Sequence, residues 1–282
     1  MLLNLKDHTD KVQRDRYEEI KESFHSLPPR FRIEAVEQTP ASGVPEIQFM
    51  ESGRPNPLTL IQVSAGIHEV LNLLTNIIGR QGLTLFIEHP ESRLHPHSMR
   101  AFQSLLFREG GQNQVILVTH SPQFVDPRAP EGLRRIWWTP GTGTKVAGPS
   151  TTITDAERGQ LATALKHLGD REILFARSVV LVEDESQREF LTGVARTLGH
   201  DIDGNSVSII DVHDENGYGK YETLLDTFEI PFVALKDKQW GDDVRYPPDS
   251  YFTLDMEIED YLDAHGLAEE RKAAADEVGQ NK

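Results

Sequence analysis

Residues 83–96 read Leu-Thr-Leu-Phe-Ile-Glu-His-Pro-Glu-Ser-Arg-Leu-His-Pro, and this stretch decides the fold. Its first five residues carry no charge, and the run ends at Glu88, which is followed by a proline and a second acid, Glu91. A short apolar run of this kind is typical of a strand buried on both faces, as in a parallel sheet. An acid at the carboxyl end of such a strand lies where open α/β sheets bind their ligands. We therefore predict an α/β fold with Glu88 at a ligand-binding sheet edge.

A carboxylate at Glu88 can hold Mg²⁺, directly or through water, beside the phosphates of a nucleotide. An ordinary strand followed by a polar loop gives the same pattern. The residues on either side must decide between these two interpretations.

The composition indicates a globular protein long enough, at 282 residues, for two domains. The absence of cysteine excludes disulfides and thiolate zinc sites and is compatible with a reducing cytoplasm, where we expect the protein. No run has the length of a membrane span, and residues 1–9 lack the layout of a signal peptide, so we expect no membrane contact.

The formal net charge of −16 argues against a broad nucleic-acid surface, because phosphates are bound by Lys and Arg. Carboxylates clustered around a bound metal would lower this negative charge locally.

Apolar periodicity predicts helices over residues 10–24, 67–78, 97–107, 154–168, 187–198 and 221–228, and a last helix from about residue 258. It predicts strands over residues 31–36, 46–49, 83–87, 115–119, 135–138, 179–182, 207–212 and 232–235. The first two strands should pair as a hairpin or small sheet, and later strands alternate with helices, which favours a mostly parallel sheet. Residues 141–150, rich in Gly, Pro, Ser and Thr, are predicted to link two domains.

Three polar segments in the first half follow one another at predicted element boundaries: 64–69, 88–96 and 118–122. This ordered set resembles the carboxyl half of ATP-binding-cassette-type ATPases of the chromosome-maintenance and DNA-repair branch. The resemblance implies that Ser64 and Gly66, at a helix start, contact the γ-phosphate of ATP bound on the opposite subunit.

By the same resemblance, Glu88 is the Walker B acid that helps to hold Mg²⁺, and His120 is the switch histidine that contacts the γ-phosphate. His95 and Pro96 match a Leu-His-Pro step of this branch.

The chain departs from this family in two ways. His89 stands where the family carries the acid that orients the attacking water, and Glu91 is offset. The chain contains no Gly-x-x-x-x-Gly-Lys-Ser/Thr loop to bind the α- and β-phosphates. Residues 217–220, Gly-Tyr-Gly-Lys, come nearest to this motif but lack its first spacing and its hydroxyl. We therefore expect an amino-terminal truncation or a nucleotide-cradling half on another polypeptide, with poor ATP binding by this chain alone.

The second half repeats the opening pattern twice. An apolar run ends at Glu183, Asp184 and Glu185, and about fifty residues later another ends at Lys236 and Asp237. Adjacent parallel strands would bring Glu183 and Asp237 within reach of one Mg²⁺, an ion that activates water and stabilises the leaving oxygen in phosphodiester cleavage.

These residues resemble the Toprim domain, whose hallmark is a Glu after one strand and Asp-x-Asp after a later one. The intervening segments 208–212 and 219–221 are similar to those of the overcoming-lysogenization-defect nucleases, in which a cassette ATPase precedes Toprim. The resemblance covers residues 60–261 and implies that Glu183 and Asp237 are metal ligands. It also suggests that Lys220, Lys236 or Lys238 contacts the scissile phosphate.

The Toprim pattern is incomplete. Gln239 replaces the second acid of Asp-x-Asp, and Gln187 replaces an acid four residues after Glu183. We expect Glu185 and an acidic cluster near the carboxyl end to compensate, with Glu259 as a further ligand; the other members of that cluster are Asp255, Glu257 and Asp260. A solvated acidic helix start would give the same cluster.

The sequence thus predicts a partial ATPase domain over 1–145, a linker and helix over 146–172 and a Toprim-like domain over 173–282, each domain with a mostly parallel sheet. We expect a hydrolase: an ATP-linked DNA endonuclease that uses Mg²⁺ or Mn²⁺, working as a homodimer or with an amino-terminal ATPase segment. Two alternatives are a non-catalytic regulatory or scaffold remnant and a protein with ATPase function alone.

Overall fold

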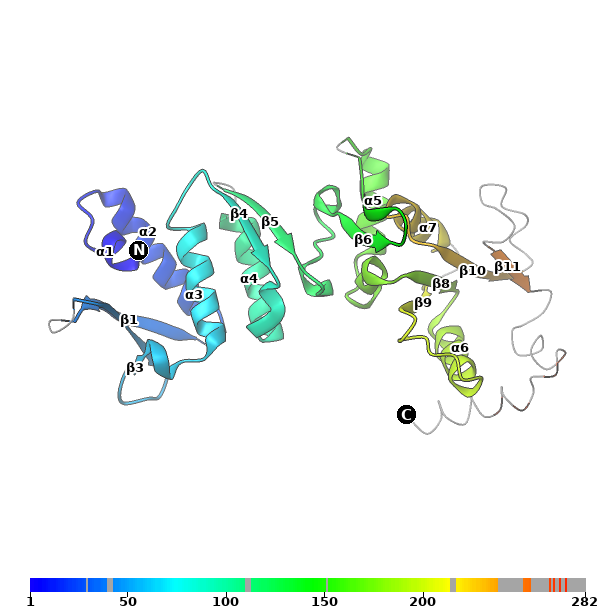
Figure 1. Ribbon diagram of the computed structural model, residues 1–282, viewed down its shortest axis with the longest axis horizontal. Helices are drawn as coiled ribbons and strands as arrows, with labels where there is room; N and C mark the ends of the chain where they lie inside the picture. The colour runs from blue at the N-terminus through cyan, green and yellow to red at the C-terminus, as the bar shows by residue number, and fades with distance from the viewer. Residues whose placement is uncertain are drawn as a thin grey trace. The chain divides into compact units, whose positions relative to one another are not determined.

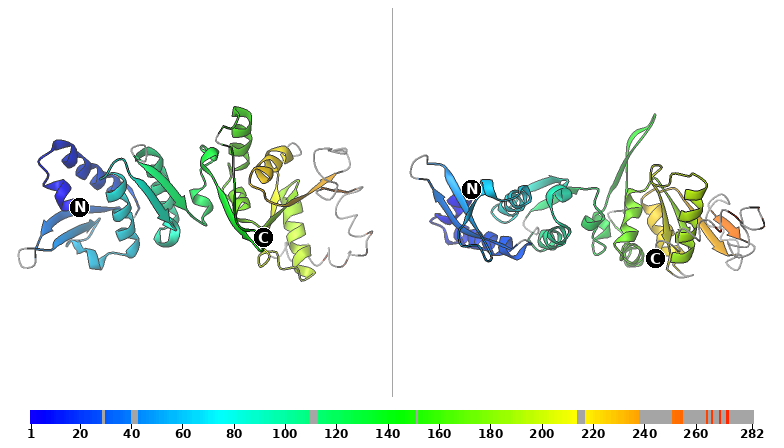
Figure 2. Two further views of the ribbon diagram at one scale, coloured as in Figure 1. Left: turned by 45° about the horizontal axis from the view of Figure 1, so that its top comes forward. Right: turned by 90° about the horizontal axis from the view of Figure 1, so that it is seen from below.

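The computed structural model describes residues 1–28, 30–39, 43–109, 113–150, 152–213, 217–237 and 251–254, and the single residues Ala264, Gly266, Glu269 and Lys272. At residues 108, 109, 237 and 251–254 the description covers the backbone alone. The chain forms two compact units, Met1–Phe124 and Val125–Lys282. Figures 1 and 2 show the elements of both units.

The first unit contains an antiparallel sheet in the order β1-β2-β3 and a two-stranded parallel sheet, β4-β5, with helices between them in sequence. Its elements are α1 (Leu2–Lys6), α2 (Lys11–Ser26), β1 (Phe31–Gln38), β2 (Pro45–Glu51), β3 (Leu58–Thr59), η1 (Leu60–Gln62), α3 (Ala65–Ile77), β4 (Thr84–Glu88), η2 (Pro90–Arg93), α4 (Pro96–Glu109), β5 (Gln114–Val118) and η4 (Pro122–Phe124).

Helix α3 follows the predicted spacing, because the residues that it buries recur every three or four positions and face the core of this unit. Helix α2 is capped by Asp10, whose side chain accepts a hydrogen bond from the Val12 amide. The predicted hairpin of β1 and β2 is present.

One prediction for the first unit is wrong: β4 and β5 are buried on one face only. Leu85 and Ile87 pack towards the core, whereas Phe86 is 72% exposed, and Ile116 and Val118 on β5 are 37% and 43% exposed. The described part of this sheet has two strands, and no described residue of the first unit covers its second face. An apolar run therefore identified the strand correctly but not what surrounds it.

The second unit is built on a four-stranded sheet in the order β11-β10-β8-β9, in which every pairing is parallel. Its elements are η5 (Pro130–Gly132), β6 (Arg135–Thr139), β7 (Gly143–Ala147), α5 (Asp155–Ala164), η6 (Gly169–Phe175), β8 (Ser178–Val182), α6 (Glu185–Thr197), β9 (Val207–Asp211), α7 (Tyr218–Thr227), β10 (Phe232–Asp237) and β11 (Tyr251–Leu254). The predicted α/β class with parallel sheets is confirmed.

Helices α6 and α7 lie on opposite faces of this sheet (Figure 1). The chain moves from β8 to β9 through α6 and then back across β8 to β10 through α7. Right-handed crossovers in opposite directions must place their helices on opposite faces. The face towards α7 buries Val179, Leu181, Ile210 and Ala234 with residues of α5 and α7.

The predicted linker over residues 141–150 is wrong in this structure. Residues Gly143–Ala147 form β7, which pairs antiparallel with β6, and Gly141 and Gly143 have positive φ angles of 82° and 80° in the turn between them. The glycines therefore supply the backbone conformation of a tight hairpin turn. The predicted domain bounds of 145 and 173 stay a prediction.

Helix α5 begins with a reciprocal capping box between Thr154 and Glu157 and ends at Ala164, before the predicted residue 168. Strand β11 was not predicted, and the predicted last helix lies almost entirely outside the described residues. None of the helices in the described part of the chain is both long and apolar enough to cross a membrane.

Candidate functional site

The carboxyl ends of β8 and β10 lie side by side, and this edge carries Glu183 and Asp237, two of the four acids predicted to bind metal. β10 pairs with β8 with Ala234 opposite Leu181. Two residues further along this register, Lys236 comes opposite Glu183, so Asp237 lies one position beyond on the neighbouring strand. Adjacent strands are about 4.8 Å apart. The structure therefore brings the backbones of Glu183 and Asp237 to one edge; the side chain of Asp237 lies outside the description.

The backbone of Glu183 is held by α6. The side-chain oxygen of Gln187 accepts a hydrogen bond from the Glu183 amide at 3.1 Å, and the Gln187 amide donates to the Asp184 side chain, which caps the helix. Gln187, which stands where an acid was expected, thus fixes the strand end that carries Glu183. An amide oxygen can do this without adding a negative charge to the edge.

Arg188, the next residue of α6, joins the helix to β9. Its guanidinium contacts Asp211 at 2.5 Å and Glu185 at 3.0 Å. The Asp211 side chain is 5% exposed and the Glu185 side chain 72% exposed. Glu185, predicted as a metal ligand, is therefore paired with Arg188 on the surface of the helix.

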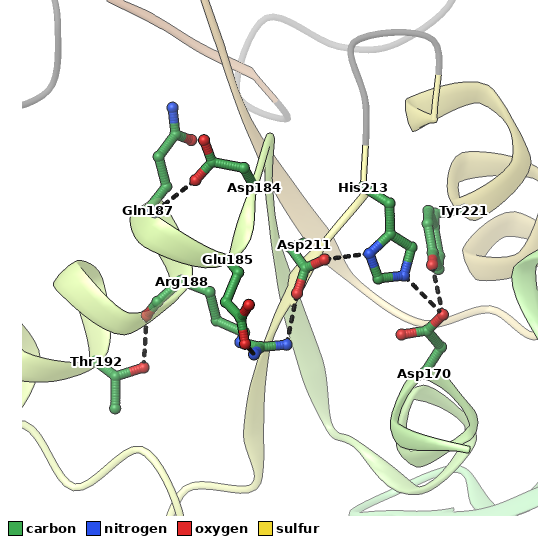
Figure 3. Close-up of polar contacts among 9 residues, drawn as sticks. All are labelled: Asp170, Asp184, Glu185, Gln187, Arg188, Thr192, Asp211, His213 and Tyr221. Atoms are coloured by element: carbon green, nitrogen blue, oxygen red, sulfur yellow. Dashed lines mark hydrogen bonds and ion pairs between the residues drawn. The ribbon is translucent and has the colours of Figure 1, made fainter. Parts of the chain in front are cut away.

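His213 lies at the same edge, beyond the end of β9, and sequence reasoning missed it (Figure 3). Its ring lies between the carboxylates of Asp211 and Asp170, and Asp170 also accepts a hydrogen bond from the Tyr221 hydroxyl at 2.6 Å. These residues come from β9, η6 and α7. The polar residues at the end of this apolar strand, Asp211 and His213, were the available sequence signal.

Lys236 points to an acid of α7, Glu222. Its ammonium group donates to Glu222 of α7 at 2.7 Å and lies 4.8 Å from the centre of the Tyr218 ring. The side chains of Lys236 and Glu222 are 10% and 2% exposed, so the ion pair is buried. This geometry argues against the predicted contact between Lys236 and a phosphate. Lys220 remains on α7, near the Tyr221 ring.

The remaining predicted ligands lie outside the described residues: Glu259 and its acidic neighbours Asp255, Glu257 and Asp260, as well as Gln239 and Lys238. Among the side chains that the structure does describe, no three His, Asp or Glu residues form a group suited to a metal ion. A site at this edge therefore depends on Glu183, on Asp237 and on ligands from water, substrate or those further residues.

In the first unit, β4 and β5 place Glu88 opposite Val118, so Glu88 and His120 share the carboxyl edge of that sheet. The ring of His120 stacks on that of His89 with 5.3 Å between the centroids. His89 adopts a left-handed backbone with φ of 49°, which turns the chain sharply after Glu88. The structure thus brings together two of the four residues predicted to bind ATP.

Glu91 ties the two loops of this edge together. Its carboxylate accepts hydrogen bonds from the Thr119 hydroxyl at 2.7 Å and from the His120 amide at 3.1 Å. Burial alone would raise the pKa of Glu91, but the hydrogen bonds from Thr119, His120 and His89 outweigh it, and the net pKa is lowered. Because both its oxygens are engaged, Glu91 holds the loop that carries His120.

Ser64 and Gly66 lie at the start of α3, where Ser64 is the N-cap residue and makes no side-chain capping bond. A Cβ on Gly66 would lie 2.4 Å from the carbonyl oxygen of Arg93, at the end of η2. Glycine at this position therefore allows the start of α3 to approach the segment that follows Glu88. Whether Ser64 contacts a phosphate stays a prediction.

Comparison with known families supports both halves of this description. Residues 3–126 match a family of AAA domains whose description also names the AbiEii toxin of a type IV toxin–antitoxin system. Residues 174–238 match the Toprim domain of overcoming-lysogenization-defect-like proteins.

Relatives with similar sequences include an uncharacterized protein of Methanocaldococcus jannaschii, 25% identical over 235 residues, which cover 83% of this chain and 28% of that protein. The OLD nuclease of Thermus scotoductus is 28% identical over 198 residues, which cover 65% of this chain and 35% of that protein. This chain therefore spans about a third of the length of these relatives.

A solved structure of the carboxyl-terminal region of the Xanthomonas campestris OLD protein is 27% identical. The match covers 35% of this chain and 59% of that one, with a TM-score of 0.29.

The fold and the two matched domains define the class, an AAA-type ATPase region followed by a Toprim domain. Within that class, the Toprim match and the similar OLD nuclease confirm the resemblance to overcoming-lysogenization-defect proteins that the sequence predicted.

Proposed function

We propose that this chain is the ATPase–Toprim portion of a DNA-cleaving protein, in which phosphodiester cleavage takes place at the carboxyl edge of β8 and β10. The observation that carries the proposal is the register of these strands, which brings Glu183 and Asp237 to one edge of an OLD-like Toprim domain. A protein of this kind acts on DNA in the cytoplasm.

The donor chemistry of this edge suits Mg²⁺ or Mn²⁺. Mg²⁺ keeps several water ligands and is commonly held by one or two carboxylates together with substrate phosphates, and Glu183 and Asp237 supply two. When bound, such an ion lowers the pKa of a water ligand and neutralises charge on the phosphate.

The surrounding residues position these acids. Gln187 fixes the Glu183 backbone, and the Arg188–Asp211 contact joins α6 to the neighbouring strand, so the strand ends keep their spacing. Lys220 is the described cation of α7 that can approach a phosphate. Glu259, and Glu185 after release from Arg188, would complete the ligand set.

For the first unit, we propose that ATP binds at an interface with a second subunit or with a polypeptide that supplies the phosphate loop. Ser64 and Gly66 would contact the γ-phosphate, Glu88 would hold Mg²⁺ and His120 would sense the γ-phosphate. The shared edge of Glu88 and His120 supports this arrangement. Glu91 is occupied by Thr119 and His120, which favours slow hydrolysis.

The test is nicking of supercoiled plasmid by the full chain in Mg²⁺ or Mn²⁺. Glu183→Ala should abolish nicking and Asp237→Ala should reduce it at least about a hundredfold, as expected for ligands of a catalytic ion. Glu189→Ala, a change of the same kind on α6, should leave nicking unchanged. Nicking that survives in the Glu183 variant would refute the proposal.

One observation favours a second candidate, a non-catalytic scaffold or regulatory protein. Gln187 and Gln239 occupy acid positions, and the described side chains form no metal-binding group of three. On this alternative, the wild-type chain would show no metal-dependent nicking to lose. Nucleotide-dependent dimerisation without nicking would instead indicate ATPase function alone.

A further inference from the structure

The imidazole of His213 lies between two carboxylates that come from different elements (Figure 3). Its Nδ1 faces Asp211 Oδ1 of β9, and its Nε2 faces Asp170 Oδ2 of η6 at 3.3 Å. The residue also has a left-handed backbone, with φ of 68°. Both ring nitrogens can donate to both acids only when the ring is protonated.

The two acids are buried, with side-chain exposures of 5% for Asp211 and 7% for Asp170. Arg188 provides a second partner for Asp211, and the Tyr221 hydroxyl provides one for Asp170. Buried carboxylates need cations or hydrogen bonds, and a partner that is removed leaves an uncompensated charge. The described partners of the two carboxylates are therefore the Arg188 guanidinium, the Tyr221 hydroxyl and the His213 ring, and Arg171 of η6 attracts Asp170 electrostatically.

This network reaches the strand end that carries Glu183. The Val212 amide, between Asp211 and His213, donates to the Val182 carbonyl at 2.8 Å, which continues the pairing of β9 with β8. On the other side, Arg188 binds Asp211 while the preceding residue, Gln187, binds the Glu183 amide. Consecutive residues of α6 therefore connect His213 and Asp211 to Glu183.

We propose that His213 is a positioning residue of the Toprim metal site. Its ring holds Asp211 against Arg188 and so keeps the first turn of α6, and with it the Glu183 backbone, in the geometry that binds a divalent ion. His213 does not touch the ion. This inference rests on the proposed function, because it concerns the site formed by Glu183 and Asp237.

The groups that face the ring come from several elements. They are Asp211 from β9, Asp170 from η6, Tyr221 from α7 and the ring of His167, whose centroid lies 4.9 Å away. Arg188 of α6 binds the same Asp211 carboxylate, and Arg171 of η6 attracts Asp170.

The experiment measures Mn²⁺ affinity of the full chain by titration calorimetry, without DNA or nucleotide. We expect His213→Gln to weaken Mn²⁺ binding about tenfold at pH 6, the lower end of the effect of outer-shell partners. The matched control is His200→Gln, at an exposed position with only a backbone hydrogen bond among its contacts. This control should bind Mn²⁺ like the wild type.

Two readouts separate positioning from a loss of folding. Asp170→Asn should reproduce the tenfold loss, because Asp170 cannot reach the ion except through His213. Thermal unfolding is recorded for each variant, and affinities are compared only below the onset of unfolding.

Three results are distinguishable. If Glu183→Ala removes Mn²⁺ binding and folded His213→Gln and Asp170→Asn both weaken it, the inference stands. If Glu183→Ala removes binding while folded His213→Gln and Asp170→Asn bind Mn²⁺ as the wild type does, the inference is overturned and the proposed metal site stands. If the wild type binds no Mn²⁺ that depends on Glu183, the proposed site fails, and the inference fails with it.

Discussion

The carboxyl edges of the two parallel sheets begin from the same sequence pattern and end in different environments. β4 and β8 are both short apolar strands followed by acids, and each pairs in parallel with the strand that carries the next polar segment. The edge in the second unit is braced by α6 on one face and α7 on the other. The described residues of the first unit place helices on one face of its edge, and Phe86 on the other face is 72% exposed.

This comparison separates what an acid at a strand end can do. In the second unit, neighbouring side chains hold the backbone of Glu183 and leave its strand end at the surface. In the first unit, both carboxylate oxygens of the offset acid, Glu91, accept hydrogen bonds from the Thr119–His120 loop. The strand-end acids Glu183 and Glu88 are therefore both metal-binding candidates, whereas the offset acid Glu91 serves as a structural tie.

The largest expected effect tests the bracing of the second unit. Lys236→Met leaves Glu222 buried without its cation and should lower the free energy of unfolding of this unit by about 3–5 kcal/mol. The double variant Lys236→Met, Glu222→Leu should recover most of the loss, because it removes both charges. Lys11→Ala breaks an exposed ion pair with Asp15 and should cost no more than about 0.5 kcal/mol.

Unfolding of each unit is followed by hydrogen exchange, since a chain of two units need not unfold in one step. A loss below about 1 kcal/mol for Lys236→Met would show that the ion pair is solvated, and the second edge would then be no better braced than the first.

The next effect concerns the approach of α3 to the first edge. Gly66→Ala places a Cβ 2.4 Å from the Arg93 carbonyl oxygen, so the backbone must shift. We expect a loss of about 1–3 kcal/mol, typical of overpacking, measured by denaturant unfolding of the first unit. Gly159→Ala, inside α5 with no atom within 4 Å of the added Cβ, should instead stabilise the second unit by up to about 1 kcal/mol. A change in the free energy of unfolding of the same sign for both variants would contradict the packing argument.

Much of this fold follows from local sequence. The periodicity of residues 67–78 and the apolar run of residues 83–87 predicted α3 and β4, because burial of one helix face and the period of a strand are local properties. The ATPase and Toprim resemblance came from acids and histidines at strand ends. Contacts between side chains that are distant in sequence could not be predicted in this way. Nothing in the sequence around His213 indicates Asp170 as its partner, and nothing around Lys236 indicates Glu222.

The two wrong predictions have physical reasons. A run of Gly, Pro, Ser and Thr is compatible with both a linker and a hairpin turn. Here β6 pairs with β7 across residues 141–143, so the run forms a turn. The apolar character of β4 gave no information on which elements cover it.

A smaller, pH-dependent effect tests the tie at the first edge. The pKa of Glu91 is lowered in the folded chain, so its carboxylate form stabilises the fold above the unfolded pKa of about 4.3. This contribution is lost as pH falls through the lower folded pKa. Glu91→Gln should therefore cost about 1–2 kcal/mol at pH 7 and nothing near pH 2, measured by urea unfolding. A cost that does not change with pH would show that the charge of Glu91 plays no part.

The smallest effect concerns the uncovered face of β4 and β5. Phe86→Ser should change the free energy of unfolding by no more than about 0.5 kcal/mol, because the side chain of Phe86 is 72% exposed and has little burial to lose. Ile87→Ala, at the next position but 8% exposed, should cost about 2–5 kcal/mol. Denaturant unfolding at several protein concentrations distinguishes two cases. A loss above about 1 kcal/mol for Phe86→Ser that grows with concentration would mean that copies of the chain cover this face in solution. The contrast between the two sheet edges would then describe the isolated chain and not the assembled protein.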